Sequence, residues 1–395
     1  MTCRLLRRFH LWGLNWQGGH CRSFHRLLAA RASEVSGGFH QERISTDGSL
    51  KVRWPEAGTS SKPEEEASNF SGIRPPVVPV TAPAAPPIGK DQLEKLVDLL
   101  TSCKNVLLLS GAGVSTESGT PDYRGQNGAY TTGYKPMTHQ QFMGKEGSRV
   151  RYWARNYAGW KEFSTRTPNS GHQGIAQLQR NGWLGHIITQ NVDHLHQAAG
   201  SSKVLELHGT THNVVCTDCG NLTPRFDFQS VLSGLNPVAH QIMYEQSPEA
   251  QRKWRSTLRE RRADDPPASV RPDGDVELYG AEKDFVVPSC EYCGGLLKPD
   301  VVFFGDSVPP ERATRAMELA QAADGVLVMG SSVMVYSAFR LVKAAKENGA
   351  KLAIVNVGET RVDSLADIKV EALVGEVAAL LSSHVSLLTP RPPVA

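Results

Sequence analysis

Two pairs of cysteines have the spacing of a zinc site. Cys216 and Cys219 lie in CTDCG, and Cys290 and Cys293 lie in CEYCGG. Two residues between thiolates allow both sulfur atoms to reach one tetrahedral Zn²⁺ at about 2.3 Å, and the following glycine suits the tight turn. Four thiolates fill the coordination shell and leave no position for a catalytic water, so the zinc is predicted to be structural. Free or disulfide-bonded cysteines are the alternative.

A glycine-rich loop, GAGVSTESGTPDYRG at residues 111–125, follows the apolar run NVLLLS. Such a loop after a strand is typical of a nucleotide site, because backbone amides can approach phosphate oxygens closely. The spacing matches neither G-x-G-x-x-G nor G-x-x-x-x-G-K-[ST]. The loop therefore predicts a phosphate-bearing ligand without saying which one, and an ordinary tight turn is the alternative.

The elements that must position these residues are short apolar runs: NVLLLS, LGHIITQNV, KVLELHG, GVLVMGS and KLAIVNVG. Several alternate with helix-length segments such as ERATRAMELAQAAD. This alternation predicts an α/β fold, a Rossmann-like doubly wound parallel sheet, with a smaller zinc-ribbon and helical domain. Ligands of such sheets bind at the carboxyl ends of the strands. The candidate positions are Gly111 to Ser115, Gln190 to Asp193, His208, Gly330 to Ser332 and Asn356 to Gly358.

The combination of motifs resembles the sirtuins, the NAD-dependent protein deacylases. The resemblance covers roughly residues 90–380. It rests on GAG-x-S, SG-x-PD-[FY]-R, TQN-x-D, the histidine of HG, both C-x-x-C pairs, KPDVVFFGD, GSSVMV and NVGET. The segments PDYR, RYWARNYAGW and VYSAFR further resemble the class II mitochondrial branch of that family. Together these motifs are very specific.

The resemblance implies a reaction that consumes NAD. In the family, NAD is cleaved at the nicotinamide glycosidic bond and the acyl-lysine amide oxygen captures the ribose. A base then deprotonates a ribose hydroxyl, and His208 is the implied base because imidazole titrates near neutral pH. The products are nicotinamide and an O-acyl-ADP-ribose. Mono-ADP-ribosyl transfer to proteins at the same site is the close alternative, followed by a redox dehydrogenase and a zinc-ribbon nucleic-acid binder.

The resemblance also assigns the site residues. The catalytic set is His208, Asn191 and Asp193. The NAD contacts are Gly111, Ala112, Gly113, Ser115, Thr116, Asp122, Tyr123, Arg124, Gln190, Asn191, Val192, Asp193, Gly330, Ser331, Ser332, Asn356, Val357, Gly358 and Val374, and the metal ligands are Cys216, Cys219, Cys290 and Cys293. Asn191 and Asp193 have a simpler interpretation as caps of the following helix. His194 and His196 do not suggest a metal pair, because side chains at i and i+2 of a helix point apart.

Two departures from the family pattern bear on the substrate and the site. Sirtuins that remove succinyl groups carry a Tyr-x-x-Arg pair after the loop, whereas Tyr130 is followed three places later by Gly133. A succinyl or malonyl preference is therefore not expected. Larger or neutral acyl groups, including lipoyl, biotinyl or branched ones, are expected from the resemblance. Ser337 stands where the family often has a proline.

Residues 1–33 predict a mitochondrial transit peptide. They contain six arginines and no Asp, Glu or Lys, so the net charge of +3 for the chain leaves −3 for the remainder. An Arg-rich, acid-free amphipathic start is typical of import into the mitochondrial matrix, with a disordered basic arm as the alternative. The acidic remainder argues against a nucleic-acid partner. No apolar stretch approaches the about 20 residues of a membrane span. The expected partners are acyl-lysine proteins, above all mitochondrial metabolic enzymes.

The remaining chain divides by composition. Residues 34–89, rich in Ser, Glu and Pro, predict a disordered linker. From Lys90 the segment KDQLEKLVDLLTSC has helical periodicity, so the catalytic domain is predicted at 90–385 and a tail at 386–395. The zinc-binding module is predicted at about 208–300. Seventy residues separate Cys219 from Cys290, more than the roughly 15 to 20 of a compact ribbon, which predicts a long insert at 221–289.

Overall fold

The computed structural model describes residues 84–125, 128–131, 133, 135–241, 272–276 and 284–392. The chain divides into two units, Met1–Asn69 and Phe70–Ala395, and every described residue belongs to the second. The predicted transit peptide and most of the predicted linker therefore lie outside the described residues. Within the described ranges, no helix combines the length and apolarity that crossing a membrane requires.

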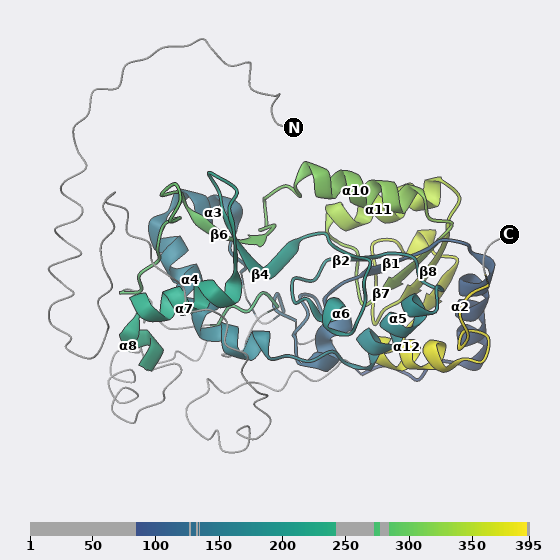
Figure 1. Ribbon diagram of the computed structural model, residues 1–395. Coiled ribbons are helices and arrows are strands. Elements are labelled where there is room, and N and C mark those ends of the chain that lie inside the picture. Colours follow the sequence, from purple (N-terminus) through teal and green to yellow (C-terminus); the bar gives the residue numbers. More distant parts are fainter. Residues whose placement is uncertain are drawn as a thin grey trace, which may run out of the picture. The chain divides into compact units, whose positions relative to one another are not determined.

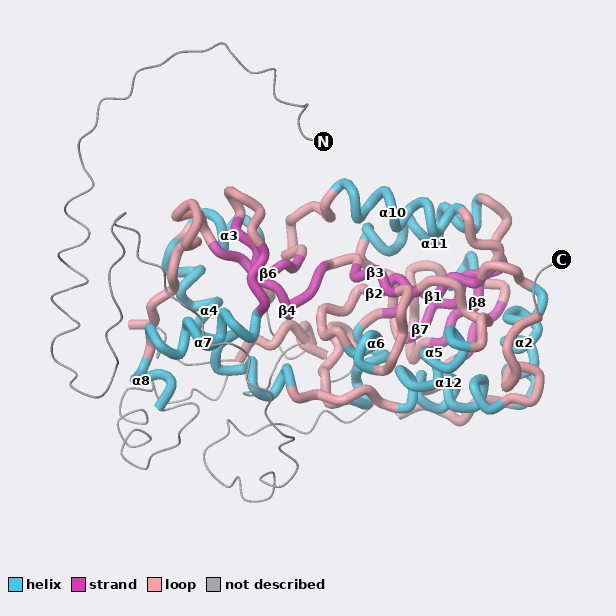
Figure 2. Tube along the Cα trace, viewed as in Figure 1, coloured by secondary structure: helices cyan, strands magenta, loops and turns pink. Residues whose placement is uncertain are grey.

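A six-stranded parallel sheet forms the centre of the larger layer, in the order β3-β2-β1-β7-β8-β9 (Figures 1 and 2). Its strands are β1(Val106–Ser110), β2(Ile187–Thr189), β3(Val204–Glu206), β7(Gly325–Met329), β8(Lys351–Val355) and β9(Ile368–Val370). Strands β1 and β7 are buried at every residue, which explains their unbroken apolar runs. The strand order reverses between β1 and β7. The predicted doubly wound parallel sheet is confirmed.

Helices cover both faces of this sheet. One face carries α2(Lys90–Ser102), α5(Ser170–Arg180) and α12(Val374–Ser383), and the other carries α10(Pro310–Gln321) and α11(Tyr336–Glu347). In Figure 1, α10 and α11 lie above the sheet and α5 and α12 below it. Each side has its own apolar core, built around Leu100 and Ile175 on the first face and Ala316 and Leu341 on the second. Burial of each leucine or isoleucine contributes about 1.5–3 kcal/mol.

The register of the sheet aligns the strand ends. Ser110 of β1 pairs with Thr189 of β2 and with Met329 of β7, and Met329 pairs with Val355 of β8. The residue after each of these positions therefore emerges at one edge of the sheet, as predicted from the apolar runs. These residues are Gly111, Gln190, Gly330 and Asn356.

A smaller antiparallel layer consists of β4(Gly209–Cys216), β5(Leu222–Pro224) and β6(Leu297–Val301), in the order β5-β4-β6. The helices α3(His139–Gly144), α4(Glu146–Ser164), α7(Arg225–Leu235) and α8(Pro237–His240) accompany it. Its core is aromatic, with edge-on contacts between the rings of Phe142, Tyr152, Trp153 and Phe228. The smaller module is therefore present, and α3 and α4 extend it beyond the predicted bounds of 208–300.

Three predicted boundaries differ from the structure. The folded part begins before Lys90, because Ile88 packs on the core and its amide donates to Glu376 Oε1 at 3.2 Å. The predicted tail is docked as far as it is described: Leu387 is fully buried and its carbonyl accepts from Trp183 Nε1 at 3.0 Å. The predicted insert 221–289 contains β5 and α7, which belong to the module. In all three segments the burial of a few apolar side chains fixes the chain on the folded part, although the composition of the segment is polar or rich in proline.

Candidate active site

A cavity of about 810 Å³ lies at the carboxyl ends of the parallel strands. Most of the predicted site residues line it: Gly111, Ala112, Gly113, Asp122, Tyr123, Arg124, Gln190, Asn191, Val192, Asp193, His208, Gly330, Ser331, Ser332, Asn356, Val357 and Gly358. Three predicted contacts are not among the lining residues. Ser115 and Thr116 are buried behind the loop, and Val374 packs in the apolar core at the start of α12. Their contact with NAD stays a prediction.

Two glycine loops meet at this cavity. Gly111 and Gly113 lead from β1 into the short 3-10 helix η1(Ala112–Ser118), and Gly330 follows β7 with a φ of 59°. The Gly113 amide donates to the Gly330 carbonyl at 2.9 Å, and a Cβ added at Gly113 would lie 2.8 Å from the Gly330 Cα. Side chains are therefore excluded from the junction, and a ligand can approach the backbone of both loops.

Ser115 holds the two other residues of the predicted catalytic set. Its hydroxyl donates to Asp193 Oδ2 at 2.6 Å and accepts from Asn191 Nδ2 at 3.0 Å. The second carboxylate oxygen of Asp193 accepts from the amide of Leu195, where α6(Leu195–Ala198) begins, at 3.1 Å. Asp193 therefore accepts from the first amide of α6, although His194 is the N-cap residue, and it also lines the cavity. Asn191 does not cap the helix, because its side-chain amide donates to Ser115.

Two buried histidines lie behind this layer. His172 Nε2 is 3.4 Å from Ser115 Oγ, and His196 Nε2 is 2.8 Å from Ser110 Oγ. Burial lowers the pKa of His172 to about 4 and holds the pKa of His196 well below its ordinary value. Both rings are therefore neutral structural groups at physiological pH. His194 turns instead to Glu206 Oε1 at 3.1 Å, so the two histidines of HLH do not form a metal pair.

His208 follows β3 in the wall of the cavity. Its Nδ1 is 3.2 Å from the backbone carbonyl oxygen of Gln190, and its Nε2 is 2.8 Å from Ser337 Oγ. Burial lowers the pKa of His208 to about 4, against the opposing effect of the Gln190 carbonyl, and the charge of Arg312 lowers it further. The ring is therefore neutral at physiological pH and available as a proton acceptor.

The loop that carries Asp122, Tyr123 and Arg124 is held by contacts of its own. The Asp122 carboxylate accepts from the Gly125 amide at 2.8 Å, and burial raises its pKa although the amides of Gly125 and Arg124 oppose the shift. The rings of Tyr123 and Tyr130 lie with centroids 5.6 Å apart, and the Arg124 guanidinium lies 5.2 Å from the Tyr130 ring. Asp122 therefore organises the loop, while the loop as a whole lines the cavity.

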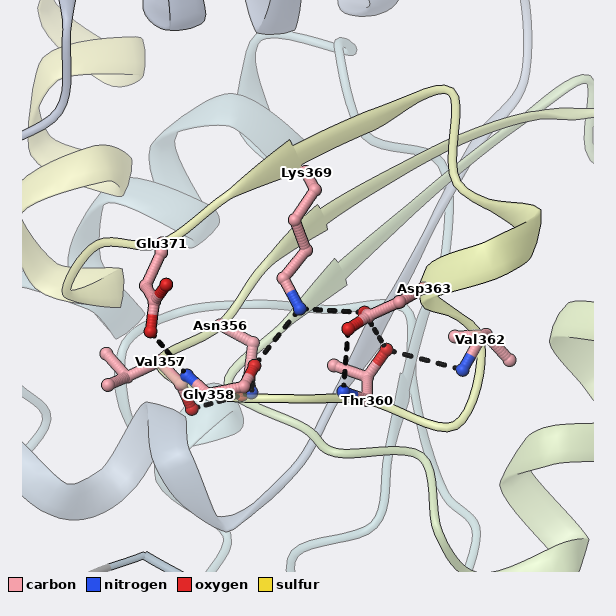
Figure 3. A network of polar contacts seen from close by, with 8 residues as sticks. All are labelled: Asn356, Val357, Gly358, Thr360, Val362, Asp363, Lys369 and Glu371. Carbon is pink, nitrogen blue, oxygen red and sulfur yellow. Dashed lines mark hydrogen bonds and ion pairs between the residues drawn. The ribbon is translucent and has the colours of Figure 1, made fainter.

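The loop after β8 is shaped by side chains of its own and of β9 (Figure 3). Asn356 Nδ2 donates to the Gly358 carbonyl oxygen at 3.2 Å, and Gly358 donates through its amide to Glu371 Oε1 at 3.0 Å. Lys369 Nζ bridges the same carbonyl at 3.0 Å and Asp363 Oδ1 at 2.7 Å, where Asp363 begins η3(Asp363–Leu365). These bonds fix the backbone that lines this end of the cavity without a ligand.

The four predicted metal ligands come together in the smaller module. The sulfur atoms of Cys216, Cys219, Cys290 and Cys293 all lie within 4.8 Å of one another. The Sγ atoms of Cys216 and Cys293 are 3.4 Å apart, too far for a disulfide and close to the separation of two thiolates on one zinc ion. Each pair is closed by the same turn, in which the glycine after the second cysteine has a φ near 73° or 74°. The donor set fits tetrahedral Zn²⁺.

Sequence reasoning missed one wall of the cavity. The wall consists of residues 301–308, which run from the last residue of β6 onward, together with Ser337 and Arg340 of α11 and with Pro272 and Asp273. The signal for residues 301–308 is present in KPDVVFFGD, an apolar strand followed by a glycine turn as at the other strand ends. Ser337 and Arg340 lie within a helical pattern, and no local signal shows which residues of a helix reach a cavity.

The comparisons with known proteins agree with this geometry. A family model described as "Sir2 family" matches residues 111–337. The chain is 46% identical over 303 residues to an Arabidopsis thaliana protein named NAD-dependent protein deacylase SRT2, across 75% of this chain and 77% of that protein. It is 39% identical over 336 residues to a Homo sapiens protein named NAD-dependent protein lipoamidase sirtuin-4, mitochondrial, across 84% of this chain and 96% of that protein.

Solved structures give the same result. A structure described as Sir2 with a p53 peptide and NAD⁺ matches with a TM-score of 0.53 and 29% identity, across 73% of this chain and 97% of that one. The segment matched by the family model contains the glycine loop, the polar strand ends, His208, all four cysteines and Ser337. The chain therefore belongs to the Sir2 family.

Proposed function

We propose that this chain is an NAD-dependent protein-lysine deacylase that releases nicotinamide and an O-acyl-ADP-ribose. The observation that carries the proposal is the neutral imidazole of His208 in the wall of the same cavity as the paired glycine loops. The Arabidopsis thaliana and Homo sapiens relatives are named for NAD-dependent deacylase and lipoamidase activity. NAD is on this account a reactant rather than a redox cofactor.

The residues of the cavity fit a dinucleotide. Gly113 and Gly330 let the two loops pack backbone against backbone, and the neighbouring residues Gly111, Ala112 and Ser331 line the cavity where phosphate oxygens would bind. Gln190 Nε2 donates to Ser331 Oγ and Asn191 Nδ2 donates to Ser115 Oγ, so the side-chain carbonyl oxygens of Gln190 and Asn191 are the groups that suit a carboxamide and sugar hydroxyls. The loop of Asn356 is the candidate for the adenosine end. NAD, when bound, supplies an electrophilic ribose carbon; the protein orients it and excludes water.

His208 is the proposed general base. Its Nδ1 keeps a proton in the bond to the Gln190 carbonyl, which leaves Nε2 to take a proton from a substrate hydroxyl. Asn191 and Asp193, held by Ser115, are the proposed groups beside the bond that is cleaved. Ser115 of η1 fixes both Asn191 and Asp193, and the Gln190 carbonyl after β2 fixes His208, so the site is organised before substrate binds.

We further propose that the acyl group is neutral or bulky. Apolar side chains of Met137, Val301, Phe303 and Val335 contribute to the cavity lining. Arg124, which precedes the expected acyl-recognition segment, lies over the Tyr130 ring, and Lys135 within that segment is exposed. Lipoyl, biotinyl and branched acyl groups are the leading candidates, in agreement with the sequence.

The test of the function uses labelled NAD and a panel of acyl-lysine peptides, read by mass spectrometry. Deacylation predicts label on a small O-acyl-ADP-ribose and one free lysine for each nicotinamide released. Mono-ADP-ribosyl transfer uses the same cavity, and no observation on this chain favours it. Label found on protein, with the acyl peptides unchanged, would replace the deacylase proposal with that activity.

The zinc ion is proposed to be structural and to bind once per chain. Its four thiolates complete a tetrahedron, and the cluster lies among β4, β5 and the segment before β6, outside the lining of the cavity. Zinc would therefore link two chain segments and contribute to the free energy of folding, and it would take no part in the reaction.

We infer that the protein works in mitochondria, in the matrix, on metabolic enzymes that carry acyl-lysine. The inference is supported by the Arg-rich first 33 residues and by the Homo sapiens relative, whose name includes mitochondrial. A fusion of residues 1–45 to a fluorescent reporter tests it in cells. The reporter should enter mitochondria and be shortened on entry; a full-length reporter left in the cytosol would refute the location.

A further inference from the structure

The Nε2 atom of His208 is already hydrogen-bonded to a cavity-lining side chain that has no assigned role. Ser337 Oγ lies 2.8 Å from His208 Nε2. Ser337 is the second residue of α11, and both side chains line the cavity. The base is therefore held from two directions, by the strand end that carries Gln190 and by a helix that packs on the sheet.

These two partners fix which ring nitrogen carries the proton. A carbonyl oxygen only accepts hydrogen bonds, so Nδ1, which is 3.2 Å from the Gln190 oxygen, must be the protonated nitrogen. In the neutral ring Nε2 then has a lone pair, and the Ser337 hydroxyl donates to it. Burial keeps the ring neutral, with a pKa of about 4. Ser337 therefore donates to the basic nitrogen itself.

The charged groups around the ring do not supply this bond. Arg312 of α10 lowers the pKa of His208 from a distance, and its Nη2 lies 3.4 Å from Asp300 Oδ1 of β6. Arg340 follows Ser337 by three residues on α11 and lines the cavity. Both side chains are cations. A cation that donated a hydrogen bond to Nε2 would also repel the positive charge that His208 acquires when it takes up a proton. In the described part of the chain, the hydrogen bonds to the ring come from Gln190 and Ser337.

We propose that Ser337 is a positioning residue for His208, an inference that rests on the proposed deacylase function. Its hydroxyl keeps Nε2 unprotonated and directed at the place where a substrate hydroxyl binds. When that hydroxyl replaces Ser337, its proton passes to Nε2 and the electron pair stays on the substrate oxygen. Nδ1 keeps its own proton in the bond to Gln190, Ser337 is chemically unchanged, and nothing is oxidised or reduced.

Ser337→Ala removes the donor and leaves the backbone of α11 intact. The value of kcat/KM should fall about 3- to 10-fold at neutral pH, because the ring without this donor also adopts orientations in which Nε2 does not meet the substrate hydroxyl. The acid limb of the pH profile should move up by about 0.5–1 unit, because a donor to Nε2 stabilises the neutral ring. Ser337→Thr retains the hydroxyl and should restore kcat/KM to within about twofold. Ser230→Ala, at an exposed position of α7, is the matched control.

A second measurement does not depend on turnover. In the full chain labelled with ¹⁵N-histidine, the His208 ring is assigned by comparison with His208→Gln and titrated by NMR. The wild-type ring should show protonated Nδ1 and unprotonated Nε2 near neutral pH. In Ser337→Ala the Nε2 resonance should shift. The pKa of the His208 ring should rise by the same amount as the pKa seen in the acid limb of the kcat/KM profile.

These two readouts separate the proposal from the function on which it rests. A wild-type chain with no NAD-dependent deacylation would contradict the function, and the NMR titration would still test Ser337. An unchanged His208 resonance together with an unchanged pH limb in Ser337→Ala overturns the proposal. A loss of activity that is equal at every pH, with a lower unfolding temperature and an unchanged ring pKa, also overturns it, because it shows a merely structural role.

Discussion

Gly113 occupies a position at which the proposed NAD site has no room for a side chain. A Cβ at this position would lie 2.8 Å from both the Cα and the carbonyl oxygen of Gly330, and neither backbone atom can rotate away as a flexible side chain would. The two loops, which are proposed to bind the phosphates of NAD, would have to separate. Overpacking of this kind costs about 1–3 kcal/mol.

Gly113→Ala is therefore expected to weaken NAD binding by about tenfold or more, since each tenfold corresponds to about 1.4 kcal/mol. Calorimetric titration with NAD measures the change. Gly147→Ala in α4 is the matched control, because a Cβ added there meets nothing within 4 Å. Equal NAD affinity for the wild type and Gly113→Ala would refute the role of the glycine junction.

For single residues, the sequence predicts the position of a side chain along a strand better than it predicts the direction of that side chain. The strand ends follow from apolar runs, so the positions of Gln190, Asn191 and His208 at the cavity could be predicted. Ser115 is predicted as an NAD contact, which stays a prediction, but no sequence pattern indicates that its hydroxyl bonds Asp193 and Asn191. The sequence around Ser337 did not predict its contact with His208, and its one unusual feature is that the family often has a proline at this position. Side-chain direction depends on neighbours that come from distant parts of the chain.

Among the elements, the smaller module depends on the two cysteine turns. Strands β4 and β6 pair directly before the first and after the second turn, and Cys216 itself pairs with Leu297. A zinc ion bound by both turns ties the ends of the segment from 220 to 289, much of which lies outside the described residues. The free energy of zinc binding is therefore also free energy of folding for this module.

Cys219→Ser is expected to lower bound zinc from about one per chain to a small fraction and to lower the unfolding temperature of the module. Metal analysis and near-ultraviolet circular dichroism measure the two effects, since the module holds Trp153, Tyr152 and Phe228 in contact. Cys103→Ala removes a thiol of the large layer and should retain zinc. Full zinc content in Cys219→Ser would contradict the four-cysteine site.

The extent of the module could not be predicted from the cysteines. Helices α3 and α4 precede the first cysteine pair by more than fifty residues, and only packing shows that they share a core with α7. Arg225 of α7 illustrates the difficulty: it is 1% exposed, with Nη2 donating to Asn156 Oδ1 at 3.0 Å and its guanidinium 4.6 Å from the Trp160 ring. A sequence pattern assigns arginine to the surface.

For the molecule as a whole, buried neutral histidines make stability depend on pH. His172 and His196 are less than 2% exposed, and burial lowers the pKa of each far below the unfolded value of about 6.5. Below about pH 6.5 the unfolded chain binds protons that the folded chain does not bind. The free energy of unfolding therefore falls as the pH falls through this window, until His172 itself titrates near 4.

The loss from these two histidines together should be on the order of 2–3 kcal/mol at about pH 5.5 relative to pH 7.5. Urea unfolding at both pH values, with excess zinc, measures it. His196→Gln removes one of the titrating rings, so the difference between the wild type and this variant isolates the histidine contribution from that of the zinc ligands. A wild-type unfolding midpoint that does not change, or that rises in acid, would contradict this account.

The central claim is that NAD is consumed by a reaction in which His208 is the base. The most direct measurement compares the wild type with His208→Tyr on the best acyl-lysine peptide, counting nicotinamide, free lysine and O-acyl-ADP-ribose in one incubation with NAD. The wild type should form the three products in equal amounts. His208→Tyr should form almost no free lysine while retaining its zinc and its unfolding temperature. Deacylation by His208→Tyr at a rate close to that of the wild type would contradict the account.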